Sequence, residues 1–241
     1  MTVSRLMYDE MYQIARSGKI LVAIMLDYEH LKAKQRAIVD SFSPSLSLRT
    51  HRALSWLQRA EKEKDDNDAR FLFLWIAFNA AYANEILDRK YLTERRLLLG
   101  FLNRLVESDK KGLIYEIVWE QFSSSIRVLI RNKYVYQPFW DYQNGTKSES
   151  DWMEAFERSK KSANRALGRT DTKKLLAVIF DRLYVLRNQI VHGGSTWNSR
   201  VNRGQMKDGA NILGHLVPTI IHLMMENHDQ LWGDASYPVV E

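Results

Sequence analysis

Three residues in the C-terminal third of the chain have the types and spacing needed for acid–base chemistry on a phosphate. The segment LYVLRNQIVHGG places Arg187 next to Asn188, and His192 follows four residues later. An arginine offers a planar set of donors that matches two phosphate oxygens. Histidine exchanges a proton near neutral pH, and an amide can fix its tautomer or hold an oxygen. Together these groups suit phosphodiester cleavage that needs no metal and no cofactor.

The reaction that best suits these side chains is attack by a ribose 2′-hydroxyl on the adjacent phosphorus. His192 is the expected base, Arg187 would stabilise charge on the non-bridging oxygens, and Asn188 would support them. Because the 2′-hydroxyl is the nucleophile, the expected substrate is RNA.

A helix predicted over residues 171–192 positions these side chains. Thr170 or Asp171 is expected to cap its start, and Gly193 with Gly194 can adopt the left-handed conformation that ends it. At about 100° per residue, one apolar stripe forms the core face. It comprises Leu175, Ile179, Leu183, Leu186 and Ile190.

The other side of this helix is expected to face away from the core. It carries Asp181, Tyr184, Asn188 and His192, with Arg187 at the edge of the apolar stripe. Asn188 and His192 are four residues apart and are therefore near neighbours. His192 lies in the last turn, where the helix dipole favours a protonated imidazole. It is either a catalytic residue or a plain solvent-facing histidine.

The whole chain reads as helical, because prolines are few and apolar residues recur at three- and four-residue spacing. We predict helices at 4–17, 20–40, 47–64, 68–87, 92–107, 112–131, 149–166, 171–192 and 199–227. Loops are expected at 41–47 and at 137–150, where Asn144-Gly145 forms a turn. The predicted architecture is an all-α multi-helix bundle. An N-terminal helical extension (1–45) precedes the main domain (46–232) and a tail (233–241).

Positive charge is concentrated around the motif. The net charge is +6, but residues 158–207 carry twelve Lys or Arg and only two acids, a net +10, which leaves −4 for the rest. Such a block is a footprint for a polyanion, or a solvated helix face. The expected phosphate contacts are Arg200, Arg203 and Lys207, and Lys160, Lys161, Arg165 and Arg169 would extend this track. Trp197 offers a surface for base stacking, or is simply packed.

Several other classes of site are disfavoured. The chain has no cysteine, which excludes disulfides, thiolate metal sites and cysteine nucleophiles. His215 and His222 would lie about 10.5 Å apart along one helix, too far to share a metal ion, and Pro218 between them is expected to kink that helix. No phosphate-binding G-x-x-x-x-G-K motif is present. The apolar runs at 20–26 and 71–78 fall short of the ~20 residues that a bilayer requires, so a cytoplasmic protein without membrane contact is expected.

The pattern R-N-x-x-x-H at the end of a helix resembles the motif of the HEPN superfamily (higher eukaryotes and prokaryotes nucleotide-binding). That motif is an arginine, four to six residues and a histidine, often with a polar residue after the arginine. Arg187 to His192 matches it. The segment DARFLFLWIAFNAAYANE (68–85) is similar to the long apolar helix that precedes the motif helix in that family. The resemblance covers about residues 47–227.

The resemblance implies a metal-independent endoribonuclease with a HEPN-type helical fold. In that family two protomers pack with their motif helices together, so that a shared cleft receives an Arg and a His from each. The products are a cyclic phosphate and a 5′-hydroxyl. Many members are toxins or antiviral defence effectors, so a homodimer and an antitoxin or other regulatory protein are expected partners.

Asn79 is a polar residue within the apolar segment 68–85. It is expected to make a structural hydrogen bond in the core, or to support Arg187 or His192.

Two rival interpretations stay open at this point. One is a non-catalytic HEPN-like module that binds nucleic acid, a nucleotide or a partner protein through the same basic face. The other is a structural helical bundle. The chain also departs from the compact family toxins, with about forty extra N-terminal residues and a wide insertion between 88 and 166.

Overall fold

The computed structural model describes residues 26–82, 91–230, 232–235 and 237, with the side chains of 91–94 left aside. Every regular element in these ranges is helical, which confirms the all-α prediction. The first half runs through α2 (Tyr28–Ile38), η1 (Val39–Ser41), α3 (Pro44–Glu61), α4 (Asn67–Tyr82), α5 (Tyr91–Ser108), α6 (Leu113–Tyr115) and the π-helix η2 (Glu116–Gln121). The second half comprises α7 (Ser123–Arg131), η3 (Lys133–Val135), α8 (Gln137–Gln143), α9 (Glu149–Gly168), α10 (Thr172–Val191) and α11 (Arg203–Glu226). The helix predicted at 4–17 lies outside the described residues.

Side-chain oxygens begin the main helices where the sequence indicates. Ser43 accepts a hydrogen bond from the Leu46 amide and is followed by Pro44 in the first turn of α3. Of the two candidates for α10, Asp171 is the cap, and it accepts from the amide of Lys174. At the other end Gly193 takes the left-handed conformation, with φ of 68°.

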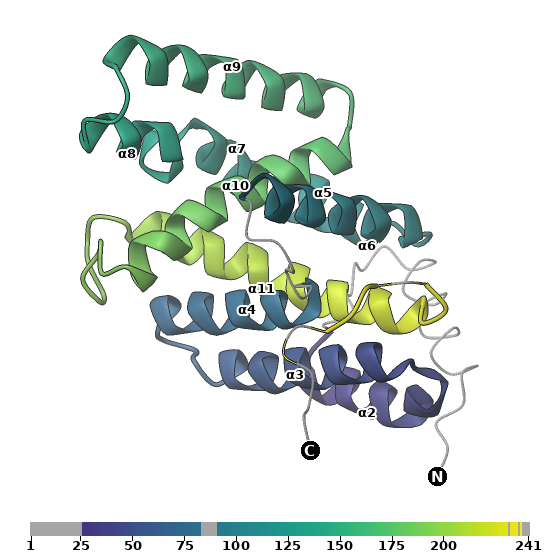
Figure 1. Ribbon diagram of the computed structural model, residues 1–241. Helices are drawn as coiled ribbons and strands as arrows, with labels where there is room; N and C mark the ends of the chain where they lie inside the picture. Colours follow the sequence, from purple (N-terminus) through teal and green to yellow (C-terminus); the bar gives the residue numbers. More distant parts are fainter. Residues whose placement is uncertain (1–25, 83–90, 231, 236, 238–241) are drawn as a thin grey trace.

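The helices stack in layers around one main core (Figure 1). α3 and α4 pack along each other, α11 covers both, and α10 crosses between α4, α5, α7 and α9. The rings of Phe78 and Phe180 stack with centroids 4.4 Å apart where α4 meets α10. Gly209 lets α11 approach closely, because a Cβ there would lie 3.1 Å from Phe71 and 3.3 Å from Leu186. Aromatic stacking and close backbone approach therefore fix where α10 sits.

The buried part of α10 is wider than one stripe. Four stripe residues are fully buried as predicted, and Ile190 is partly buried, but Leu176, Phe180 and Val185 are buried as well. The prediction that Tyr184 faces away from the core was wrong, because its ring packs 6.2 Å from that of Trp75. A helix surrounded by several neighbours buries more than one face, and a single apolar stripe does not describe it.

The helix predicted at 112–131 is interrupted. Its buried apolar positions are 114, 117 and 118 and then 126, 129 and 130, a pattern that slips by one residue from helical spacing. The π-helical turn, with the Phe122 amide bonded to the carbonyl of Ile117 at 3.0 Å, absorbs the extra residue. Both halves can then face the core.

Part of the loop predicted at 137–150 is helical, which corrects that prediction. α8 forms because the Phe139 ring packs edge-on against Trp152 of α9, 5.2 Å between centroids, in a small separate aromatic cluster. Tertiary packing here outweighs the turn signals of Pro138 and Asn144. The expected turn does follow, with Gly145 at φ of 73°.

The described part of the predicted N-terminal extension, residues 26–45, shares the main core. Leu31 of α2 is buried within it, and Gln35 donates to the hydroxyl of Thr50 on α3. α11 continues through Pro218 without ending. Within the described residues, no helix is both long and apolar enough to cross a membrane.

Candidate active site

His192 ends α10 and is exposed to solvent. Its backbone amide donates to the carbonyl of Asn188 at 3.0 Å, which closes the last helical turn. The chain then leaves the helix at Gly193, and the Ser195 amide returns to the carbonyl of Gln189 at 3.1 Å. The imidazole therefore stands at the helix tip, on a backbone that is held on both sides.

Arg187 and Asn188 contact each other directly. The Arg187 guanidinium donates through Nη1 to the Asn188 side-chain oxygen at 3.0 Å. Both side chains are partly buried, and the Arg187 Nε is buried with no hydrogen-bond partner among the described residues. Asn188 thus lies between the arginine, which it binds, and His192, one turn further along the helix. The last turn of α10 therefore carries a bonded guanidinium and amide and, at its end, an exposed imidazole.

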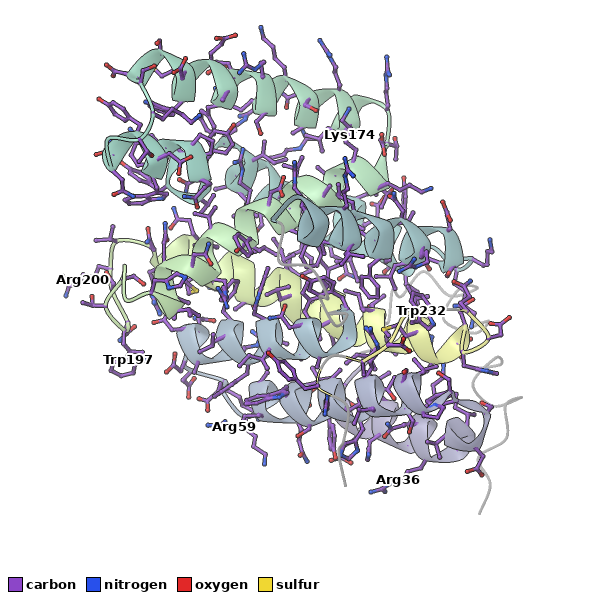
Figure 2. The ribbon with its side chains drawn as sticks, in the orientation of Figure 1. Arg36, Arg59, Lys174, Trp197, Arg200 and Trp232 are labelled. Atoms are coloured by element: carbon purple, nitrogen blue, oxygen red, sulfur yellow. The ribbon has the colours of Figure 1, made fainter. Side chains whose placement is uncertain are left out.

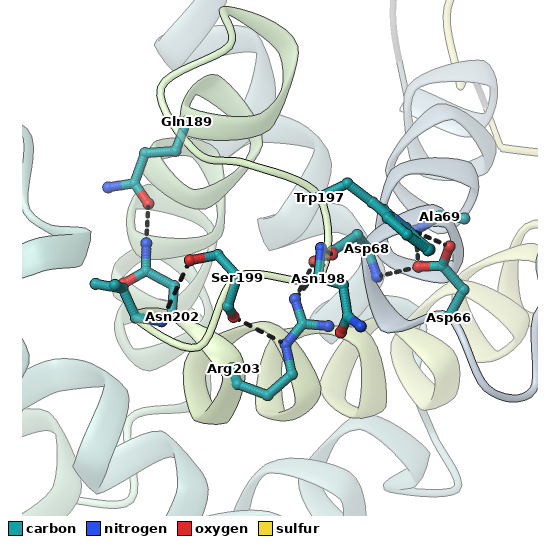
Figure 3. A network of polar contacts seen from close by, with 10 residues as sticks. Asp66, Asp68, Ala69, Gln189, Trp197, Asn198, Ser199, Asn202 and Arg203 are labelled. Carbon is teal, nitrogen blue, oxygen red and sulfur yellow. Dashed lines mark hydrogen bonds and ion pairs between the residues drawn. The ribbon is translucent and has the colours of Figure 1, made fainter.

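The loop that follows His192 is anchored to the N-terminus of α4 (Figure 3). Asp68, nearly buried, accepts from Arg203 Nη2 at both oxygens (2.7 and 2.8 Å) and from the Asn198 amide at 2.7 Å. Asn198 has φ of 55°, an unusual conformation that this bond helps to hold. The loop position is therefore set by a carboxylate about 130 residues earlier in the chain.

Asp66 makes the second anchor. It caps α4 by accepting from the amides of Asp68 and Ala69, and its other oxygen accepts from Trp197 Nε1 at 2.8 Å. Burial pushes its pKa up, but the hydrogen bonds from Ala69, Trp197 and Asp68 outweigh that effect and lower the pKa overall. Asp66 is therefore ionised at neutral pH and holds the indole by its nitrogen.

Trp197 presents its ring to solvent, with 74% of the residue exposed. It projects from the molecule near Arg200, which is also exposed (Figure 2). A ring fixed at one edge and open on its face suits base stacking. Lys207 is exposed on α11 as well.

Arg203 is committed to Asp68 and, through Nε, to the carbonyl of Ser199 at 3.3 Å. Its position explains how the loop is held. Its contact with RNA stays a prediction.

Asn79 does not lie beside the motif. Its neighbour Phe78 stacks on Phe180, which precedes Arg187 by two helical turns, about 10 Å along α10. Asn79 is partly exposed, and no hydrogen bond of its side chain is found among the described residues. The expected structural hydrogen bond and the support of Arg187 both lack a contact here.

The wider basic block is not one continuous surface. Arg158 pairs with Glu154, Lys160 with Glu157 and Lys173 with Glu107. Arg182 is buried, with its guanidinium 4.3 Å from the Tyr136 ring centre. Lys161 and Arg165 of α9 and the following Arg169 are exposed to solvent, as are Lys133 in η3 and Arg200 and Lys207 after the motif.

His215 and His222 have separate environments. The His215 ring packs 4.9 Å from that of Phe122, whereas His222 Nδ1 lies 3.2 Å from Lys34 Nζ. In the part of the chain that is described, no three His, Cys, Asp or Glu side chains group as metal ligands would.

A cavity of about 880 Å³ lies between α2, α3 and residues 234–235. None of its lining residues belongs to α10 or to the loop after it.

Sequence reasoning missed Asp66, Asp68 and Gln189. The run DDND before an apolar segment was a signal for a helix cap, but nothing in it named a partner in a distant loop. Gln189 lies within the motif, yet its role appears only in three dimensions. Its amide nitrogen donates to the carbonyl of Tyr134 at 2.7 Å, and its oxygen accepts from Asn202 at 3.3 Å.

A scan against protein-family models finds no match for this chain, and searches of curated proteins and of solved structures also find none.

Proposed function

We propose that this chain is a metal-independent endoribonuclease of HEPN type. The observation that carries the proposal is that Arg187, Asn188 and His192 lie together at the C-terminal end of α10. The guanidinium is bonded to the Asn188 amide, and His192 is exposed one helical turn after Asn188. The anchored loop then adds an exposed indole for a base.

The proposed reaction is transesterification followed by release. His192 removes the proton of the ribose 2′-hydroxyl, the 2′-oxygen bonds to phosphorus, and the bond from phosphorus to the 5′-oxygen breaks. Arg187 stabilises the charge on the non-bridging oxygens, and the Asn188 amide nitrogen is available to a further oxygen. A proton delivered to the leaving 5′-oxygen completes the step. The products are a cyclic phosphate and a 5′-hydroxyl.

A homodimer would supply that second proton. Packing two α10 helices about a two-fold axis brings a second His192 to the cleft, where one imidazole acts as base and the other as acid. Val191, 45% exposed beside His192, offers apolar surface for such a contact. We further propose a cytoplasmic toxin or antiviral effector whose activity a regulatory protein restrains.

The test is RNA cleavage by the purified protein in excess chelator. We expect cleavage that persists without divalent metal and falls at least about 100-fold in His192→Ala and in Arg187→Ala, the usual range for lost acid–base or charge-stabilising groups. Lys174→Ala, on the same helix but at its other end, is the matched control and should cleave normally. Equal cleavage by His192→Ala would refute the assignment.

The second candidate function is RNA binding without cleavage. The bond from Arg187 to Asn188 and the burial of Arg187 Nε favour it, because they withdraw part of the guanidinium from solvent in the single chain. It predicts salt-dependent RNA affinity that His192→Ala leaves unchanged and no product with a cyclic phosphate end.

A further inference from the structure

Tyr134 lies beside the motif, although it is more than fifty residues away in the sequence. Its backbone carbonyl accepts from the side-chain amide nitrogen of Gln189 at 2.7 Å. Gln189 lies within the motif, so this bond joins η3 to the end of α10. Figure 3 shows that nitrogen pointing away from Trp197. Tyr134 and Trp197 therefore belong to two separate segments, η3 and the loop after His192, each held by its own hydrogen bonds.

The Tyr134 side chain is partly exposed to solvent and packs against a neighbouring aromatic ring. The residue is 47% exposed, and its ring meets Phe139 edge-on with centroids 5.4 Å apart. Lys133 Nζ lies over the ring, 5.3 Å from its centre, and 5.2 Å from the centre of the Phe139 ring. The Trp140 indole donates to the same Tyr134 carbonyl at 2.9 Å. A ring with a fixed backbone and a neighbouring cation is a platform for a base and its phosphate.

Gln189 connects the two platforms. One end of its amide holds Tyr134, the other end accepts from Asn202, and its backbone carbonyl accepts from Ser195. Asn202 and Ser195 belong to the loop that carries Trp197. Gln189 therefore links the backbone of Tyr134 to the loop after His192, through its side chain and its backbone carbonyl.

We infer that Tyr134, with Lys133, forms a second base-stacking subsite next to the motif, in addition to Trp197, so that the substrate is single-stranded RNA. The inference rests on the proposed ribonuclease function and adds the class of RNA. A paired strand has its bases stacked on each other and offers no free face to either ring, whereas an unpaired strand can place one base on each side of the scissile phosphate.

The charges near the rings favour RNA over a protein surface. Lys133 lies over the Tyr134 ring and Arg200 is exposed near Trp197, whereas the carboxylates Asp66 and Asp68 are already bonded to Trp197 and Arg203. The negatively charged phosphates of RNA complement this excess of positive charge. A second copy of this chain would bring the same positive charge to the contact.

The experiment measures binding of a fluorescent single-stranded oligoribonucleotide whose 2′-hydroxyls are methylated, so that it cannot be cleaved. Loss of one stacked base is worth about 1–3 kcal/mol, and 1.4 kcal/mol is tenfold. We expect Tyr134→Ala to raise the Kd about tenfold, Tyr134→Phe to keep the wild-type Kd, and Gln189→Ala to weaken binding as well. A duplex of the same sequence should bind more weakly.

Tyr115 provides the matched control. It is 45% exposed on α6, also beside another aromatic ring, and Tyr115→Ala should bind RNA as the wild type does. Thermal unfolding of each variant checks that the fold is kept, and Tyr134→Phe retains the packing on Phe139.

Three results would overturn the inference: an unchanged Kd for Tyr134→Ala, equal binding of duplex and single strand, or a change in oligomeric mass with RNA affinity intact. The last would mean that the ring contacts another protein chain. If Tyr134→Ala weakens binding but the wild type never cleaves RNA, the subsite stands and the nuclease proposal fails. If cleavage depends on His192 but not on Tyr134, only the subsite fails.

Discussion

Asp68 shows how much of the candidate site depends on single contacts made at a distance. It is a nearly buried carboxylate that receives a guanidinium and a backbone amide from the segment after His192. Hydrogen bonds to a charged acceptor are stronger than neutral ones, and a buried partner left without its acceptor is costly. The loop conformation should therefore be sensitive to this one charge.

We predict that Asp68→Asn lowers the free energy of unfolding by about 1–3 kcal/mol and reduces RNA cleavage, because it removes a charge that several donors need. Urea denaturation and cleavage rates measure the two effects. Asp181→Asn is the matched control, since it breaks the exposed pair with Arg95 and should cost less than about 1 kcal/mol. Equal effects of the two substitutions would contradict the anchoring role of Asp68.

The sequence alone predicts the motif residues, but it does not predict the contacts that hold the neighbouring segments in place. The order of Arg187, Asn188 and His192 on one helix follows from their spacing alone. The links from Asp68 to Arg203 and from Gln189 to Tyr134 join segments far apart in the chain. Charge and polarity show that such residues need partners, but only the packing of the helices selects the partner.

At the scale of the helices, close packing against α11 and α4 determines the position of α10. α11 passes α10 and α4 at Gly209, where the space for even one methyl group is taken by Phe71, Leu183 and Leu186. Interiors are packed to crystal-like density, so an added group must push a helix away.

We predict that Gly209→Ala lowers the free energy of unfolding by about 1–3 kcal/mol, despite the better helix propensity of alanine. Gly204→Ala, in the same helix with nothing within 4 Å of the added group, should instead be neutral or stabilising by up to about 1 kcal/mol. Thermal or urea unfolding of the pair distinguishes them. A stabilised Gly209→Ala would show that α11 is free to shift.

The presence and ends of the helices were easier to predict than the helices against which each one packs. The caps Ser43 and Asp171 and the left-handed Gly193 mark helix ends by local chemistry, which a sequence displays. α8 forms only because aromatic residues of α9 lie above it, and Tyr184 is covered only because Trp75 reaches it. Both depend on elements that local periodicity does not place.

At the scale of the whole molecule, a cluster of charges ties the N-terminal helix to the last one. Lys34 of α2 contacts His222 and Glu226 of α11, and Lys111 lies 4.0 Å from the same Glu226. Burial, and then the charge of Lys34, lower the pKa of His222 to about 4. Glu226 also has a lowered pKa, because the bond from Lys34 and the nearby charges outweigh its burial.

We predict that stability falls as the pH drops from about 6.5 toward 4. In this pH range His222 is protonated in the unfolded state but neutral in the folded state. Lowering the pH therefore decreases the free energy of unfolding, by on the order of 1–3 kcal/mol. Urea denaturation across this range measures the slope, and His222→Gln should flatten it. The exposed His51→Gln should leave it unchanged. An unaltered slope in His222→Gln would contradict this assignment.

The anchoring of the motif loop to α4 has a consequence for how the protein is made. A ribosome releases α4 before α10, the loop after His192 and α11. The donors of Asp66 and Asp68 therefore emerge after these two carboxylates, and the loop can take its final position only once α11 has packed on α3 and α4. A nascent chain would therefore lack the assembled loop until α11 has been made, which would delay the proposed ribonuclease activity.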